Sequence, residues 1–130
     1  MSGKSDLKTL FKSMNPILHD GSYVFCTLEN FAFIDPKDLL MTFREAEGTT
    51  VIIRKELADR LSLNYDFTAA WITLMVHSSL DFVGLTAAFS TALADNGISC
   101  NVVAGYFHDH LFVNFTDAKK AMEILQSISG

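Results

Sequence analysis

Apolar residues recur at helical spacing near the start of the chain. Four of them occupy positions i, i+3, i+4 and i+7, which is typical of an amphipathic helix: Leu7, Leu10, Phe11 and Met14. Ser5 or Asp6 supplies a possible N-cap. Asn15-Pro16 follows, and because proline disfavours continuation of a helix, we predict that the helix stops there.

The rest of the first half has the spacing of strands. Residues 23–28 are rich in β-branched and aromatic side chains and predict a strand, and residues 29–38 predict a loop. Residues 39–44 and 49–54 flank the turn Glu45-Ala46-Glu47-Gly48, which predicts a β-hairpin. Residues 55–61 carry apolar side chains on one side and predict a short helix.

The second half predicts the order strand, helix, strand, strand, helix. Residues 70–76 form an apolar strand that stops at His77-Ser78-Ser79. A helix follows and ends at Asn96-Gly97, with its apolar stripe made by Phe82, Leu85, Phe89, Ala92 and Leu93. Residues 98–107 and 111–115 predict two strands around His108-Asp109-His110. Thr116 then caps a last amphipathic helix.

The order of elements in the second half is weakly repeated in the first half. There, a loop near Phe31 and Phe33 takes the place of the central helix. A strand, a helix and another strand in one sheet place their helices on one face. We therefore predict an α+β protein with two ferredoxin-like (βαββαβ-type) halves, residues 1–66 and 67–130, each with an antiparallel sheet.

Composition narrows the possible functions. The 130 residues include 15 Asp and Glu against 10 Lys and Arg, for a formal net charge of −5. Without a basic cluster the chain lacks the electrostatic basis of nucleic-acid binding, so we expect no nucleic-acid partner. No apolar run approaches the ~20 residues of a membrane span, and no signal-type segment follows Met1, so we expect no membrane partner and a cytoplasmic protein. Cys26 and Cys100 are far apart and fit buried, inert thiols.

Polar residues gather where the strand 70–76 meets the following helix. His77-Ser78-Ser79 and Gly84 bring backbone N–H groups and the positive end of a helix dipole together, which would stabilise an anion such as a carboxylate. The structural alternative is that Ser78 or Ser79 only caps the helix, and that Gly84 only permits close packing of the helix on the sheet.

The histidines do not form a recognisable catalytic or metal-binding pattern. His108 and His110 would place two imidazoles on one face of an extended segment, but no third metal ligand is nearby in sequence, and a polar hairpin turn is the favoured interpretation. Neighbouring Ser, His and Asp in residues 77–81 rarely make a triad. We expect no metal, no cofactor and no catalytic residue, and hence a protein that is not an enzyme.

Residues 81–99, from Asp81-Phe82-Val83-Gly84-Leu85 to Asn96-Gly97-Ile98-Ser99, resemble the signature of the ACT domain. The similarity spans nearly all of residues 70–130, and the whole chain resembles small stand-alone bacterial proteins with two ACT-like halves. Two departures bear on the ligand. The family's frequent Asp-x-Pro-Gly turn has no proline here, and the family's usual Asn is Ser99, with Asn101 two residues further along.

The resemblance implies a non-enzymatic regulatory or sensor module that binds an amino acid or similar small ligand at an interface between ACT domains, in a homodimer. Backbone N–H groups of residues 79–85 would hold the carboxylate, and Asn101 or Ser99 would contact the amino group. The implied ligand-binding residues are His77, Ser78, Ser79, Leu80, Asp81, Val83, Gly84, Leu85, Ser99, Asn101, Val102 and Val103. The alternative is an assembly module without a ligand that docks on an enzyme or transporter.

Overall fold

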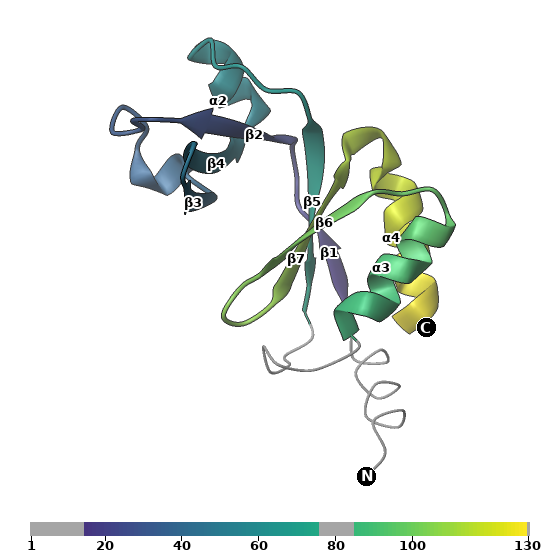
Figure 1. Cartoon of the computed structure of the whole chain (residues 1–130). Coiled ribbons are helices and arrows are strands. Elements are labelled where there is room, and N and C mark those ends of the chain that lie inside the picture. Colours follow the sequence, from purple (N-terminus) through teal and green to yellow (C-terminus); the bar gives the residue numbers. More distant parts are fainter. Residues whose placement is uncertain (1–14, 76–84, 130) are drawn as a thin grey trace. The chain divides into compact units, whose positions relative to one another are not determined.

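The computed structural model describes residues 15–75 and 85–129 (Figure 1). The chain divides into two compact units. Unit 1 comprises residues 1–20 and 70–130, and unit 2 comprises residues 21–69. Unit 1 is therefore assembled from two segments that are distant in the sequence.

The elements follow one another in this order: β1 (Pro16–Leu18), β2 (Tyr23–Leu28), the 3-10 helix η1 (Pro36–Asp38), β3 (Met41–Glu45), β4 (Gly48–Arg54), α2 (Lys55–Arg60), β5 (Thr68–Leu74), α3 (Leu85–Asp95), β6 (Cys100–Ala104), β7 (Asp109–Asn114), the 3-10 helix η2 (Phe115–Asp117) and α4 (Ala118–Ser129). No helix in these parts of the chain is long and apolar enough to cross a membrane.

Unit 2 is built on antiparallel strand pairs. β4 pairs with β3 on one side and with β2 on the other, and β2 also pairs with the first residues of β5. Because side chains alternate along a strand, β2 and β4 turn one set of apolar residues to the same face. These residues pack with Ala58 of α2 and form the core of unit 2: Val24, Cys26, Val51 and Ile53.

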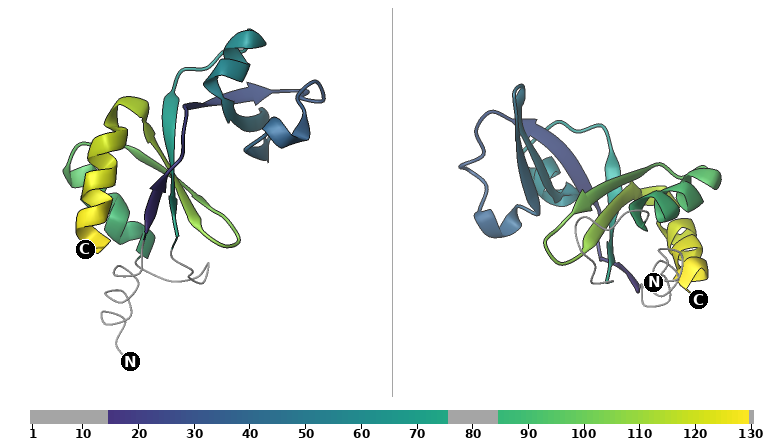
Figure 2. Two further views of the ribbon diagram at one scale, coloured as in Figure 1. Left: turned by 180° about the vertical axis from the view of Figure 1, so that it is seen from behind. Right: turned by 60° about the horizontal axis from the view of Figure 1, so that its bottom comes forward.

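Unit 1 packs two helices on a sheet (Figure 2). In this sheet β7 lies between β5 and β6, and the three-residue strand β1 pairs antiparallel with β5. The core contains side chains from β5, β7, α3, α4 and the connection between α3 and β6: Ala70, Ile72, Leu74, Phe89, Leu93, Ile98, Leu111, Val113, Ala121 and Leu125. Both helices therefore cover the face of the sheet that carries Ile72 and Leu111, and Trp71, Thr73 and His110 point to the opposite face.

The α+β architecture with antiparallel pairing is confirmed, as are the hairpin of β3 and β4 and the helices α2, α3 and α4. The helix expected over residues 7–14 lies outside the described residues. Two expectations are wrong in detail. Pro16 was expected only to end a helix but begins β1, and Asp109 and His110 were expected in a turn but begin β7.

Candidate functional site

The turn after α3 fixes the position of the predicted ligand residues on β6. Gly97 has a φ of +75°, its N–H donates to the carbonyl of Ala94 over 2.9 Å, and the N–H of Ile98 donates to the carbonyl of Leu93 over 3.0 Å. These two bonds form a Schellman motif, which satisfies carbonyls that the helix end leaves without partners. Ile98 is buried in the core of unit 1, and this anchors the start of β6.

β6 is an edge strand. Among the described residues it pairs only with β7, from Cys100↔Val113 to Ala104↔Asp109. The N–H of Gly105 donates to the carbonyl of His108 over 2.9 Å, and backbone groups alternate in direction along an antiparallel pair. The backbone groups of Asn101 and Val103 therefore point towards β7, and those of Cys100, Val102 and Ala104 point away from it.

The side chains of β6 also alternate. Val102 and Cys100 pack against the core of unit 1, and burial raises the pKa of the Cys100 thiol to about 11, so this thiol stays neutral. Asn101 is exposed, and its Nδ2 donates over 3.4 Å to the carbonyl of Phe112. A weak bond of this length leaves the amide able to engage a ligand.

The structure brings four of the predicted site residues together at the start of β6. Ser99 is exposed just before the strand, and Asn101, Val102 and Val103 lie within it. Leu85 is the first residue of α3. The remaining predicted residues lie outside the described residues: His77, Ser78, Ser79, Leu80, Asp81, Val83 and Gly84. The anion site predicted at the start of the helix stays a prediction.

A second polar arrangement, which the sequence analysis missed, lies in unit 1 on the sheet face opposite the helices. We call His19, Trp71, Thr73 and His110 the histidine cluster. The Oγ1 of Thr73 lies 2.7 Å from Nε2 of His19 and 2.9 Å from Nδ1 of His110. Trp71 Nε1 donates to the same Nδ1 over 3.1 Å, and the His19 ring stacks on Trp71 with centroids 3.5 Å apart and an interplanar angle of 14°.

The indole fixes the acceptor role of His110 in the cluster. Trp71 Nε1–H can only donate, so Nδ1 of His110 must accept and its proton lies on Nε2. The hydroxyl of Thr73, only 4% exposed as a residue, lies within hydrogen-bond distance of that Nδ1 and of Nε2 of His19. Its single hydrogen can be donated to only one of the two rings at a time. Both imidazoles satisfy this chain as neutral rings.

Burial around the cluster favours the neutral imidazoles. The pKa of His19 is lowered by burial and then by His110, and the pKa of His110 is lowered by burial and then by His108. Burial raises the pKa of the neighbouring Asp109. In the part of the chain that the structure describes, no group of three or more His, Cys, Asp or Glu is placed to hold a metal ion.

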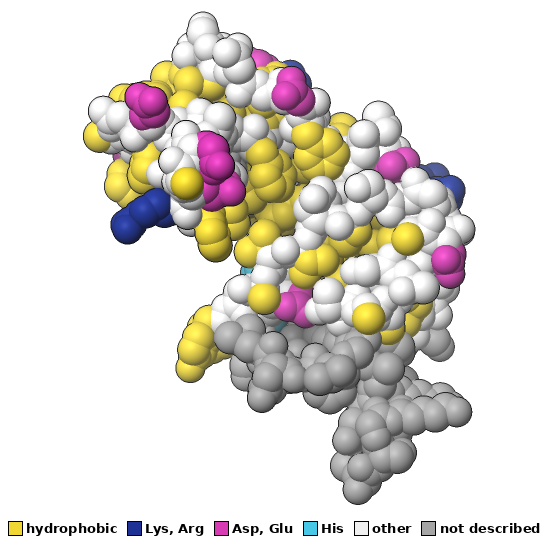
Figure 3. Space-filling view, viewed as in Figure 1, with side chains coloured by type: hydrophobic (Ala, Val, Ile, Leu, Met, Phe, Trp, Pro, Cys, Tyr) yellow, Lys and Arg dark blue, Asp and Glu magenta, His cyan; other side chains and the backbone are white. Residues whose placement is uncertain are grey.

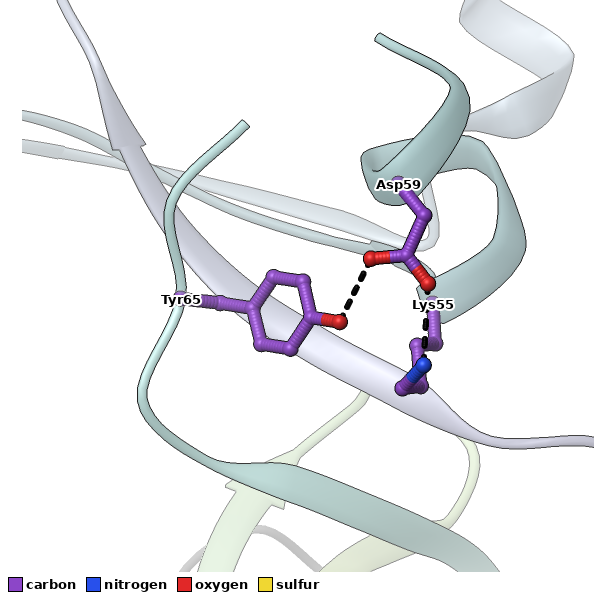
Figure 4. Close-up of polar contacts among 3 residues, drawn as sticks. All are labelled: Lys55, Asp59 and Tyr65. Atoms are coloured by element: carbon purple, nitrogen blue, oxygen red, sulfur yellow. Dashed lines mark hydrogen bonds and ion pairs between the residues drawn. The ribbon is translucent and has the colours of Figure 1, made fainter. Parts of the chain in front are cut away.

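Unit 2 carries an exposed polar contact network (Figure 4). Asp59 of α2 accepts from Lys55 Nζ over 2.9 Å and from the Tyr65 hydroxyl over 2.6 Å. The bonds from Tyr65 and Lys55 lower the pKa of Asp59. Through these two bonds the network ties the connection after α2 to the helix.

The tip of the β6–β7 hairpin presents aromatic side chains, visible as a hydrophobic projection in Figure 3. Tyr106 is 81% exposed and Phe107 is 60% exposed, and their rings meet edge to face with centroids 4.9 Å apart. Large exposed aromatic groups are unusual on a monomer and are typical of surfaces that contact another molecule.

Comparison with protein families gives two matches along the chain. One ACT-domain model matches residues 2–70, and a second ACT-domain model matches residues 67–127. None of the curated proteins compared with the chain matches it.

Solved structures that are similar to this chain agree with the two ACT-domain matches. A protein of unknown function from Vibrio cholerae, VC0802, described as a possible transport protein, has a TM-score of 0.88 and 43% identity over 99% of this chain and 100% of its own. Protein Atu0741 of Agrobacterium tumefaciens has a TM-score of 0.67 and 21% identity, with 89% of each chain covered. The ligand-free regulatory subunit of aspartate kinase from Thermus thermophilus has a TM-score of 0.62 and 8% identity, over 87% of this chain and 95% of its own, and shares the fold.

Proposed function

Because the chain belongs to the ACT-domain family, with two ACT domains, we propose that it is a regulatory module that binds an amino acid where two ACT domains meet. The observation that carries the proposal is the start of β6, where Asn101 and Ser99 are exposed beside a strand edge that is unpaired among the described residues. ACT domains are typically regulatory modules for small ligands. The proposed halves are residues 1–66 and 67–130.

In this proposal the ligand's two charged groups bind to different parts of the site. The backbone N–H groups of residues 79–85 hold the carboxylate, since helix N-termini favour anions. The amide oxygen of Asn101 accepts from the ammonium group, and Ser99 is the second candidate for this contact. Val103, half-buried on the same face of β6 as Asn101, offers apolar surface to the ligand's side chain.

A second copy of the chain supplies the other ACT domain of the interface. β6 exposes the backbone groups of Cys100, Val102 and Ala104, and its five residues include no charge and no proline. Charged residues and proline are the usual protection of a free strand edge. β3, at the end of the strand order in unit 2, has exposed Arg44 and Glu45 and is protected in this way. If β6 pairs antiparallel with β6 of a second copy, related to it by a two-fold axis, the exposed backbone groups of both strand edges become hydrogen-bonded.

The exposed rings of Tyr106 and Phe107 favour one alternative function. An assembly module that docks on an enzyme or transporter needs an apolar contact surface and no small ligand. The possible transport role given for the Vibrio cholerae relative is compatible with this alternative.

A thermal-shift panel with the twenty amino acids tests the proposal. A ligand at a hundred times its Kd stabilises the native state by about 2.7 kcal/mol, which corresponds to a rise in Tm of roughly 10 °C for a chain of this size. We expect a selective rise that Asn101→Ala removes and that the matched control Asn64→Ala, in unit 2, leaves intact. A flat panel with the wild-type chain would favour the assembly module.

A further inference from the structure

The histidine cluster joins three strands of unit 1 through one hydroxyl group. His19 directly follows β1, Trp71 and Thr73 lie on β5, and His110 lies on β7. The Thr73 hydroxyl bonds to His19 on one side and to His110 on the other. A change in the protonation of His110 can therefore affect His19, at the end of β1, through Thr73 Oγ1.

Besides this cluster, β1 is attached by a short backbone pairing with β5 and by its contact with α4. The strand has three residues paired with Ile72, Thr73 and Leu74, and its Ile17 and Leu18 side chains are exposed. Two flanking backbone bonds extend the pairing, from His19 N–H to Trp71 O over 2.9 Å and from Met75 N–H to Asn15 O over 3.1 Å. The cluster adds the stacking of His19 on Trp71 and the bond of His19 to Thr73.

Protonation of His110 is incompatible with the observed arrangement. An imidazolium carries a hydrogen on both ring nitrogens, so Nδ1–H would face the Nε1–H of Trp71, and two donors cannot bond. In that state the Thr73 hydroxyl could only accept from His110. The indole that must then move is the ring on which His19 stacks.

We propose that protonation of His110 is a switch that weakens the attachment of β1 to β5 within unit 1. The switch is a property of this chain's own side chains and is independent of the proposed amino-acid site. In the neutral state the cluster ties the three strands together, and after protonation β1 keeps its short backbone pairing with β5 and its contact with α4.

Groups from each neighbouring strand determine how His110 responds to pH. His19 lies across Thr73, and His108 and Asp109 precede His110 on its own hairpin. β5 contributes Trp71 and Thr73, and β6 places Val103 opposite His110, none of which titrates as an acid or base in this range. Burial and then His108 oppose the proton on His110 and the Asp109 carboxylate favours it, so the switch operates on the acidic side of the ordinary histidine pKa of 6.5.

The experiment uses the wild-type chain and two NMR measurements. At pH 8 the imidazole ¹⁵N shifts of His110 should report a neutral ring protonated on Nε2. Amide hydrogen exchange at His19 and Met75, corrected for the intrinsic rate, should lose protection by roughly tenfold between pH 8 and pH 5, as expected when about two hydrogen bonds are lost. Amides of Leu93 in α3 and Ile53 in β4 should keep their protection.

Matched variants separate the switch from general acid sensitivity. His110→Gln supplies a side-chain oxygen that accepts from Trp71 and does not titrate, so the pH-dependent loss at Met75 should disappear. Thr73→Ser should keep the pH-dependent loss of amide protection at Met75, and Thr73→Val should reduce this loss. A His110 ring protonated on Nδ1 at pH 8, or a His110→Gln variant that retains the full loss at Met75, would overturn the proposal.

Discussion

The indole N–H of Trp71 donates to Nδ1 of His110 over 3.1 Å, and this contact decides the protonation state of the imidazole in the folded chain. Trp71 is on β5 and His110 is on β7, so the bond spans two neighbouring strands of unit 1. The Thr73 hydroxyl lies 2.9 Å from the same nitrogen and 2.7 Å from Nε2 of His19, which makes Thr73 the link between His110 and His19.

Removing the Thr73 hydroxyl should destabilise the chain. Thr73→Val keeps the shape of the side chain but leaves two buried hydrogen bonds unmade, at a cost of roughly 1–3 kcal/mol in the free energy of unfolding. Urea unfolding at pH 8 measures this change. Thr73→Ser, which keeps the hydroxyl, should lose less, and a Thr73→Val variant as stable as the wild type would contradict the bonding assigned to the cluster.

Stability should fall on acidification. His19 and His110 have lowered pKa values in the fold, so as pH drops below 6.5 the unfolded chain binds protons before the folded chain does. The free energy of unfolding should therefore decrease from about pH 7 downwards, and these histidines should contribute no pH dependence at higher pH.

Variants of His19, His110 and Asp109 identify which groups cause this pH dependence of the free energy of unfolding. His19→Gln and His110→Gln should each flatten the curve measured by thermal unfolding between pH 7.5 and 5.5. Asp109 has a raised pKa and contributes with the opposite sign, because the folded chain holds that proton more tightly. Asp109→Asn should remove this opposing contribution and steepen the loss in acid. An unchanged curve in the double histidine variant would disprove the assignment.

Gly105 should be intolerant of a side chain. A Cβ at this position would lie 2.9 Å from the carbonyl oxygen of His108 and 3.1 Å from Nε2 of His110. Gly105→Ala should cost roughly 1–3 kcal/mol and shift the NMR signals of His110, because the backbone oxygen cannot move freely.

Gly97→Ala provides the contrast. A Cβ there meets no atom within 4 Å, so only the strain of its positive φ applies, at about 1 kcal/mol. The His110 signals should stay in place in this variant. Equal shifts of His110 in both alanine variants would show that the close contact at Gly105 is not the cause.

The proposed dimer depends on the free edge of β6. Ala104→Pro removes a backbone donor that points away from β7, so it should lower dimerisation without breaking a bond to β7. Ala104→Ser keeps the donor and is the matched control. Analytical ultracentrifugation should find the wild type and Ala104→Ser as dimers and Ala104→Pro shifted towards monomer. A wild-type monomer across micromolar concentrations would rule out the homodimer.

Periodicity predicted most of the fold because long elements carry many repeats of their pattern. The helix α4 is clear in the sequence because it presents one apolar face, and the strands β4 and β5 are clear because each carries a run of consecutive buried residues. β1 was missed because three residues contain too little alternation to recognise, and its first residue is Pro16.

The candidate functional residues were likewise predicted only in part from the sequence. Asn101 and its neighbours were identified through the family signature and lie on β6. The histidine cluster was missed because its members come from three strands that only the tertiary fold brings together. One signal was available, since Trp71 and Thr73 are two residues apart on a strand and therefore share a face with their polar atoms.

The most direct test of the account is calorimetric titration of the amino acid selected by the thermal-shift panel into the wild-type protein and into Asn101→Ala and Ala104→Pro. We expect saturable binding by the wild type, an affinity at least about tenfold weaker in Asn101→Ala from one lost charge-assisted hydrogen bond, and weaker binding by the monomeric Ala104→Pro. No saturable heat with any of the twenty amino acids, or full affinity in Ala104→Pro monomers, would contradict a ligand site at an interface formed through β6.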